Sequence, residues 1–96
     1  MNRYESMLIF SPVLKEDDLN SENDKVLDLV KSLGGEVIKT DIWGKRSLAY
    51  EIDRKREGYY FINYFRIATE KIAELENYYK LNDNILRYNV LRNDEE

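Results

Sequence analysis

The chain has 96 residues, 43% of them hydrophobic and 35% charged, which suits one compact domain with a single modest core. Nineteen acidic against fifteen basic residues give a net charge of −4, which argues against indiscriminate binding to nucleic acid, because such binding depends on many lysines and arginines. Without cysteine or histidine the chain has no disulfides, no thiolate metal site and no cysteine nucleophile, and it lacks the side chain best suited to proton transfer near neutral pH.

No apolar run approaches the ~20 residues that a membrane-spanning helix needs, and the first residues resemble neither a signal peptide nor a transit peptide. We therefore expect a cytoplasmic protein with no membrane partner.

The first half of the chain reads as strand, helix and strand. Hydrophobic and charged residues alternate over 3–10, which predicts a strand. Over 16–33 an acidic first turn precedes apolar residues at steps of three and four, which predicts an amphipathic helix, although a capping pattern at Ser21 leaves a later start open. Gly34 and Gly35 then end the helix, since glycine tolerates the positive φ of that position.

A long strand is predicted over 36–52, with Gly44 in its interior as a bulge or bend. A charged six-residue turn over 53–58 separates it from a strand over 59–67 that is dense in aromatic and β-branched residues. Thr69 is the predicted N-cap of a second helix. A final strand over 85–92 precedes a short solvated acidic end, 93–96.

This order of elements predicts an α+β fold of the ferredoxin-like, split-βαβ type over 1–96, with a four-stranded antiparallel sheet and two helices on one face. Right-handed crossovers place the first and third strands in the centre and leave the other face of the sheet open. Alternation along the strands predicts the residues of the open face as Arg3, Glu5, Met7, Ile9, Tyr60, Ile62, Tyr64, Arg66, Arg87, Asn89 and Leu91. The residues predicted to face the helices are Tyr4, Leu8, Tyr59, Phe61, Phe65, Ile67, Leu86, Tyr88 and Val90.

Charge is unevenly spread along the chain. Residues 39–66 hold seven bases against four acids, a net of +3, whereas 1–38 carry −4 and 67–96 carry −3. An anionic partner would therefore be bound by the middle of the chain.

No catalytic signature accompanies this charge. The sequence has no nucleophile elbow, phosphate-binding loop or dinucleotide fingerprint, and its clustered carboxylates are better explained as solvated helix faces. The stretch 58–64 partly matches an RNA recognition motif, but its stacking aromatics, Tyr59 and Phe61, are predicted to turn inward. We expect no enzyme activity, no cofactor, no metal site and no small-molecule substrate.

Several stretches together resemble a known family. The pattern G-x-R-x-L-A-Y-x-I within Trp43–Ile52, flanked by 3–5, 58–60 and 84–88, is similar to bacterial small-subunit ribosomal protein six. The resemblance implies the same fold and a non-enzymatic role in the cytoplasmic ribosome. It further implies binding to the central domain of small-subunit rRNA, as a heterodimer with ribosomal protein eighteen, during subunit assembly.

Residue roles follow from the open face, the basic segment and this resemblance. The expected RNA contacts are Arg3, Lys45, Arg46, Arg54, Lys55, Arg56 and Arg87. The expected contacts to the partner protein are Tyr50, Tyr60, Ile62 and Tyr64.

Alternatives stay open at this point. Arg46 could instead pair with an acid such as Glu51; Arg3 and Arg87 could form one basic patch or be solvated separately; and 54–56 could be a mobile solvated turn. The alternative function is a ligand-sensing regulatory domain that self-associates through its open face, and an acylphosphatase-like enzyme is a third that we do not expect.

Overall fold

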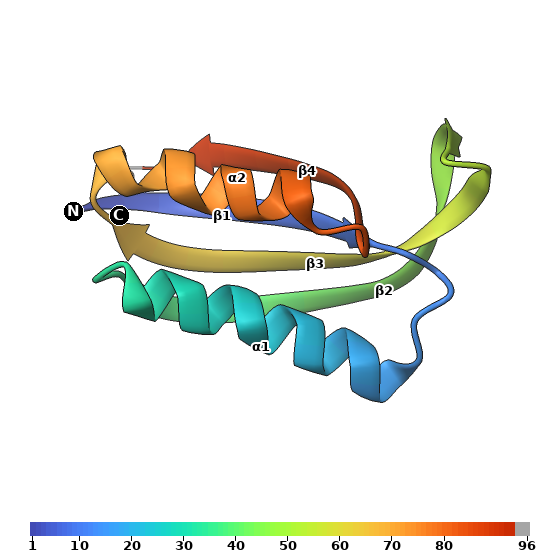
Figure 1. Ribbon diagram of the computed structural model, residues 1–96, viewed down its shortest axis with the longest axis horizontal. Coiled ribbons are helices and arrows are strands. Elements are labelled where there is room, and N and C mark those ends of the chain that lie inside the picture. Colours follow the sequence, from blue (N-terminus) through green and yellow to red (C-terminus); the bar gives the residue numbers. More distant parts are fainter. Residues whose placement is uncertain (94–96) are drawn as a thin grey trace.

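The structure is a computed structural model that describes residues 1–93. Its four strands form one antiparallel sheet in the order β2-β3-β1-β4, with both helices on the same face (Figure 1). The elements are β1 (Asn2–Phe10), α1 (Glu16–Ser32), β2 (Glu36–Ile52), β3 (Lys55–Ile67), a 3₁₀ turn η1 (Thr69–Lys71), α2 (Ile72–Leu81) and β4 (Ile85–Arg92). The predicted ferredoxin-like fold, with the first and third strands central, is confirmed.

Helix α1 begins at Glu16, the earlier of the two predicted starts. It ends in a Schellman motif, since the Gly34 N–H donates to the Lys31 carbonyl at 3.0 Å and the Gly35 N–H donates to the Val30 carbonyl at 2.9 Å. Gly34 has a φ of 85°, so the glycine is needed for its backbone conformation. Within residues 1–93, no helix is long and apolar enough to cross a membrane.

The predicted N-cap of the second helix is wrong. Thr69 opens the 3₁₀ turn, and α2 starts only at Ile72. The Thr69 hydroxyl instead accepts hydrogen bonds from the Tyr4 hydroxyl, at 3.2 Å, and from the Asn2 side-chain amide. The threonine therefore ties this turn to the start of β1 instead of capping a helix.

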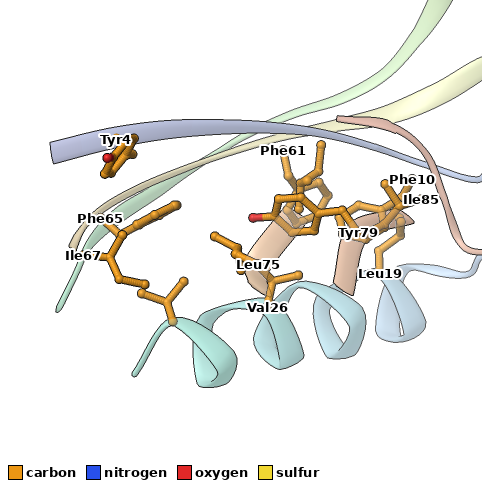
Figure 2. Packing of buried hydrophobic residues seen from close by; sticks show 12 residues of the cluster. Tyr4, Phe10, Leu19, Val26, Phe61, Phe65, Ile67, Leu75, Tyr79 and Ile85 are labelled. Atoms are coloured by element: carbon orange, nitrogen blue, oxygen red, sulfur yellow. The ribbon is translucent and has the colours of Figure 1, made fainter. Parts of the chain in front are cut away.

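The core lies between the sheet and the two helices, as Figure 2 shows. Its buried members are Tyr4, Leu8, Phe10, Leu19, Val26, Val30, Phe61, Phe65, Ile67, Leu75, Tyr79 and Ile85. One inward prediction on β4 fails: the register shifts so that Phe10 pairs with Ile85 and Ile9 with Arg87, which leaves Leu86 as the extra residue. Ile85 therefore takes the place in the core that alternation gave to Leu86.

The C-terminal end was expected to be solvated over 93–96. Asn93 is instead held against β1, since its backbone N–H donates to the Arg3 carbonyl at 2.8 Å and its side-chain amide donates to Glu5 at 2.9 Å. Residues 94–96 lie outside the described residues.

The turn between β2 and β3 has two residues, not six. Asp53 and Arg54 both have positive φ, 52° and 65°, which is the type I′ conformation, and β3 already begins at Lys55. Residues 46–58, called here the outer hairpin, extend past the ends of β1 and β4 and bend away from α1 (Figure 1, green to yellow). Lys55 and Arg56 are thus strand residues and do not belong to a mobile turn.

Candidate interface on the open sheet face

The face of the sheet without helices carries four rows of side chains that run across the strands. The first row, at the hairpin end, is called the hairpin row and comprises Trp43–Gly44, Tyr60, Ile9 and Arg87. Behind it come Asp41, Ile62, Met7 and Asn89, then Lys39, Tyr64, Glu5 and Leu91, and finally Glu36, Arg66 and Arg3. The register of the sheet thus fixes which predicted site residues are neighbours.

One end of the hairpin row lies on the edge strand β2. Its pairing with β3 is irregular between Ile42 and Gly44, and Gly44 has a φ of 84°, so the predicted bulge is confirmed with Trp43 as its extra residue. The Trp43 residue is 48% exposed, and the Arg46 guanidinium carbon lies 5.4 Å from its ring centroid. Glu51 is ion-paired with Arg56, at 3.6 Å, so the alternative pairing of Arg46 with Glu51 is not formed.

The other end of the hairpin row lies on β4, where the Arg87 guanidinium carbon is 5.0 Å from the ring centroid of Tyr50. Because Tyr50 belongs to the outer hairpin, this contact brings the hairpin back over the edge of the sheet. Gly58 permits the approach: a Cβ there would clash with Cγ2 of Ile9 and lie 3.2 Å from the Phe10 carbonyl oxygen. The bend of the outer hairpin therefore depends on a glycine at position 58, where no Cβ is present to meet Ile9.

Lys45 and the remaining basic residues of the outer hairpin have more local contacts. Lys45 forms an ion pair with Glu57 at 3.8 Å and lies over the Tyr59 ring, on the opposite side of the strand from Arg46. The Lys55 ammonium donates to the Asp53 carbonyl at 3.5 Å. Arg54 occupies the exposed turn. Among residues 1–93, the printed contacts of Arg46 and Arg87 are with aromatic rings and not with carboxylates, so no acidic side chain there neutralises their charge.

Arg3 lies far from these residues. It pairs with Arg66, whereas Arg87 pairs with Ile9, six residues further along β1. At about 3.3 Å per residue this is a separation of roughly 20 Å, so of the two alternatives left open by the sequence, a single patch of Arg3 and Arg87 is not formed. Within residues 1–93, Nε of Arg3 is a buried nitrogen that has no hydrogen-bond partner.

Charges of both signs alternate around Tyr64, near the Arg3 end. Lys39 lies 4.7 Å from the centroid of the Tyr64 ring and 3.8 Å from the Asp41 carboxylate. Burial, followed by the hydrogen bond and charge of Asp41 and the charge of Glu5, raises the pKa of the Tyr64 hydroxyl, against a smaller lowering by Arg3. This end of the face is therefore locally balanced, unlike the hairpin row.

The residues expected to contact a partner protein differ in access. Tyr50 is 56% exposed and Tyr60 and Tyr64 are half-buried, but Ile62 is only 8% exposed because neighbouring side chains cover it. Sequence reasoning placed Leu91 on the open face but assigned it no contact, although it is 54% exposed on β4. It also assigned no role to Trp43, although an aromatic residue beside a bulge glycine on a predicted strand was a usable signal.

Two grooves lie on the helix side of the molecule. One, of about 440 Å³, runs between α1 and the loop after α2, where Glu22 accepts hydrogen bonds from Lys25, Asn82 and Asn84 at 2.9, 3.1 and 3.2 Å. The other, of about 270 Å³, opens beside the start of α1 and is lined by Leu19, Ile42 and other residues. Across residues 1–93, no group of three acidic side chains is placed to hold a metal ion.

Comparison with known proteins gives one consistent result. The family model described as ribosomal protein S6 matches residues 3–92. The chain is 43% identical over 95 residues to the small ribosomal subunit protein bS6 of Thermoanaerobacter pseudethanolicus, covering 99% of this chain and 100% of that one. It is 41% identical to the protein of the same name from Heliobacterium modesticaldum, over the full length of both. The crystal structure of 30S ribosomal protein S6 from Thermotoga maritima superposes with a TM-score of 0.91 at 32% identity, covering 96% of this chain and 87% of that one.

Proposed function

The chain belongs to the ribosomal protein S6 family, and on this premise we propose that it binds the central domain of small-subunit rRNA together with ribosomal protein eighteen. As a member of that family it is a structural protein of the small ribosomal subunit in the cytoplasm and not an enzyme. Because the chain belongs to this family, the alternative function of a ligand-sensing regulatory domain is set aside. What is proposed is the rRNA contact, the partner and the role in subunit assembly.

The observation that carries the proposal is the hairpin row with the basic outer hairpin beside it. Arg87 stands at one end of this row, and Arg46 of the outer hairpin lies beside Trp43 at the other end. Both guanidinium groups lie over aromatic rings, so both retain positive charge for phosphate oxygens. Arg54, at the turn, extends the same basic end of the molecule. A few such contacts can position an RNA backbone on one edge of a protein that is acidic elsewhere.

A basic partner resolves the remaining charge problem. The chain carries a net charge of −4, so few phosphate contacts are available from it alone. The open face supplies apolar anchors for a second protein: Met7 lies in the row between those of the predicted contacts Tyr60 and Tyr64, and Leu91 lies in the same row as Tyr64. Joint binding by the two proteins would place the partner's positive surface beside the hairpin row.

The test is the affinity for a fragment of the rRNA central domain, measured with and without ribosomal protein eighteen over a range of salt concentrations. We expect weak binding by the chain alone and a large gain from the partner, with affinity falling as salt rises. Tight, salt-insensitive binding by the isolated chain, or no gain from the partner, would contradict the proposal.

The substitution Arg46→Ala probes the cation that lies beside the Trp43 end of the hairpin row. We expect it to weaken binding of the complex roughly tenfold and to lower the salt dependence by about one phosphate contact, with little change in melting temperature. The control is Arg92→Ala, which removes the same charge near the start of β1, where Arg92 donates to the Asn2 side chain. Equal losses from both variants would mean that only net charge matters.

A further inference from the structure

Trp43 is the only tryptophan of the chain, and it is placed as a surface residue. It lies outside the core, on the edge strand β2, and the bulge at Gly44 determines how its ring is presented. A tryptophan exposed to 48% is costly to leave in water, because its ring is the largest apolar side chain available. Its contact with Arg46 accounts for part of the ring surface and leaves the rest accessible.

The surroundings of the ring favour an anionic, planar ligand. Arg46 supplies a cation within 5.4 Å of the ring centroid, and Arg87 supplies a second cation in the hairpin row, which holds no carboxylate. A nucleotide joins a flat base to a phosphate, so an aromatic ring beside a guanidinium group matches both of its parts.

Because the Trp43 ring lies on a strand edge, it could stack on an unpaired base but not on a base within a duplex. In an A-form duplex the bases are stacked inside the helix and the major groove is too deep and narrow for side chains, so a ring on a strand edge cannot stack on them. A base that has left its helix, at a bulge or junction, can lie flat on such a ring.

We propose that Trp43 and Arg46 form a stacking site for one unpaired base of RNA, with Arg46 also contacting the adjacent phosphate. The inference rests on the proposed function, since it names the feature of the rRNA that the hairpin row binds. It commits to RNA as the occupant of Trp43 and leaves Tyr60 and Tyr64 to the protein partner.

The test uses the complex of this chain with ribosomal protein eighteen and two rRNA fragments, one with its unpaired nucleotides and one in which complementary nucleotides pair them. Trp43 emission is taken as the difference between the wild-type complex and the Trp43→Phe complex. We expect the first fragment to quench this emission and the paired fragment to leave it unchanged. We also expect Trp43→Leu to weaken binding of the first fragment about tenfold, and Trp43→Phe, which keeps an aromatic ring, to restore most of the affinity.

The outcomes separate this inference from the function beneath it. If the wild-type complex binds the fragment but Trp43 emission does not change and Trp43→Leu binds normally, the stacking site is wrong and the function stands. If ribosomal protein eighteen alone shifts the emission and RNA adds nothing, Trp43 contacts protein and the inference is overturned. If the wild-type complex binds neither fragment, the function itself fails. Urea midpoints of both variants confirm that each is folded.

Discussion

On one face of the sheet, β1 and β3 present Leu8, Phe61 and Phe65 to the two helices, and on the other face the same strands present Ile9 and Ile62, over which no described helix lies. Both sets are largely hidden from water, since Ile9 is 4% and Ile62 8% exposed. The first set is covered by helices, whereas the second is covered by neighbouring side chains of the same face. Burial within the chain therefore does not by itself distinguish the core from the face that we propose for a partner.

The largest expected difference between the faces is in the free energy of unfolding that is lost when a leucine is shortened to alanine. Leu8 is fully buried against the helices, so Leu8→Ala should lower the free energy of unfolding by about 3–4 kcal/mol through lost transfer energy and an unfilled cavity. Urea denaturation of the isolated chain measures this loss. The matched control is Leu91→Ala on the open face, which removes the same atoms from a residue that is 54% exposed and should cost about 0.5 kcal/mol or less. Similar costs for both variants would refute the distinction between the faces.

A smaller effect is expected from the polar group buried beneath the helices. Asn63, fully buried on β3, exchanges amide hydrogen bonds with Asn23 of α1 at 3.1 and 2.8 Å and accepts one from the Thr40 hydroxyl at 2.7 Å. Asn63→Ala leaves the buried Asn23 amide without its partner and should cost about 2 kcal/mol. Asn89→Ala, at an exposed position of the open face, should change the free energy of unfolding by only a few tenths of a kcal/mol. A neutral result for Asn63→Ala would show that water replaces the lost amide.

Gly58 is an exception to the difference between the two faces. It lies on the open face, where substitutions are expected to be mild, yet a side chain there should destabilise the fold. A Cβ there would meet Cγ2 of Ile9, so Gly58→Ala should cost about 1–2 kcal/mol and push the outer hairpin away from β1. Urea denaturation of the single and double variants measures the coupling. In the background of Ile9→Ala, which removes the clashing methyl group, Gly58→Ala should cost clearly less. Additive costs would place the strain in the backbone near Phe10.

Much of the fold could be predicted from the sequence because the strands alternate and the helices are amphipathic. Alternation placed Tyr4, Leu8 and Phe65 correctly beneath the helices, and the glycine pair after residue 33 located the end of α1. The central strands followed from the handedness of crossovers, which depends on no single residue. These patterns are local: each can be recognised in a short stretch of sequence without knowledge of the contacts between distant residues.

The parts that could not be predicted depend on contacts between distant residues. The positive φ of Arg54 has no strong sequence signal, since type I′ turns favour asparagine and glycine. The approach of Tyr50 to Arg87 requires the bend of the outer hairpin, and the separation of Arg3 from Arg87 requires the register of the sheet. The basic residues expected to contact RNA could thus be named from the sequence, whereas the fold is needed to show which of them are neighbours.

The smallest expected effect concerns pH and lies on the helix side, where the Glu22 carboxylate joins α1 to the loop before β4. Burial raises the pKa of Glu22, but hydrogen bonds from Lys25, Asn82 and Asn84 outweigh it and leave the pKa below the usual 4.5. A carboxylate with a lower pKa in the folded than in the unfolded chain stabilises the fold fully above the unfolded value, and the contribution is lost as pH falls through the folded value. We therefore expect the wild type to exceed Glu22→Gln by about 1 kcal/mol in free energy of unfolding at pH 7, with the difference disappearing as the pH falls below 4.5. Denaturation from pH 7 to pH 3 measures it, with the exposed Glu70→Gln as control; a wild-type advantage that stays constant down to pH 3 would show that the carboxylate charge does not hold this loop.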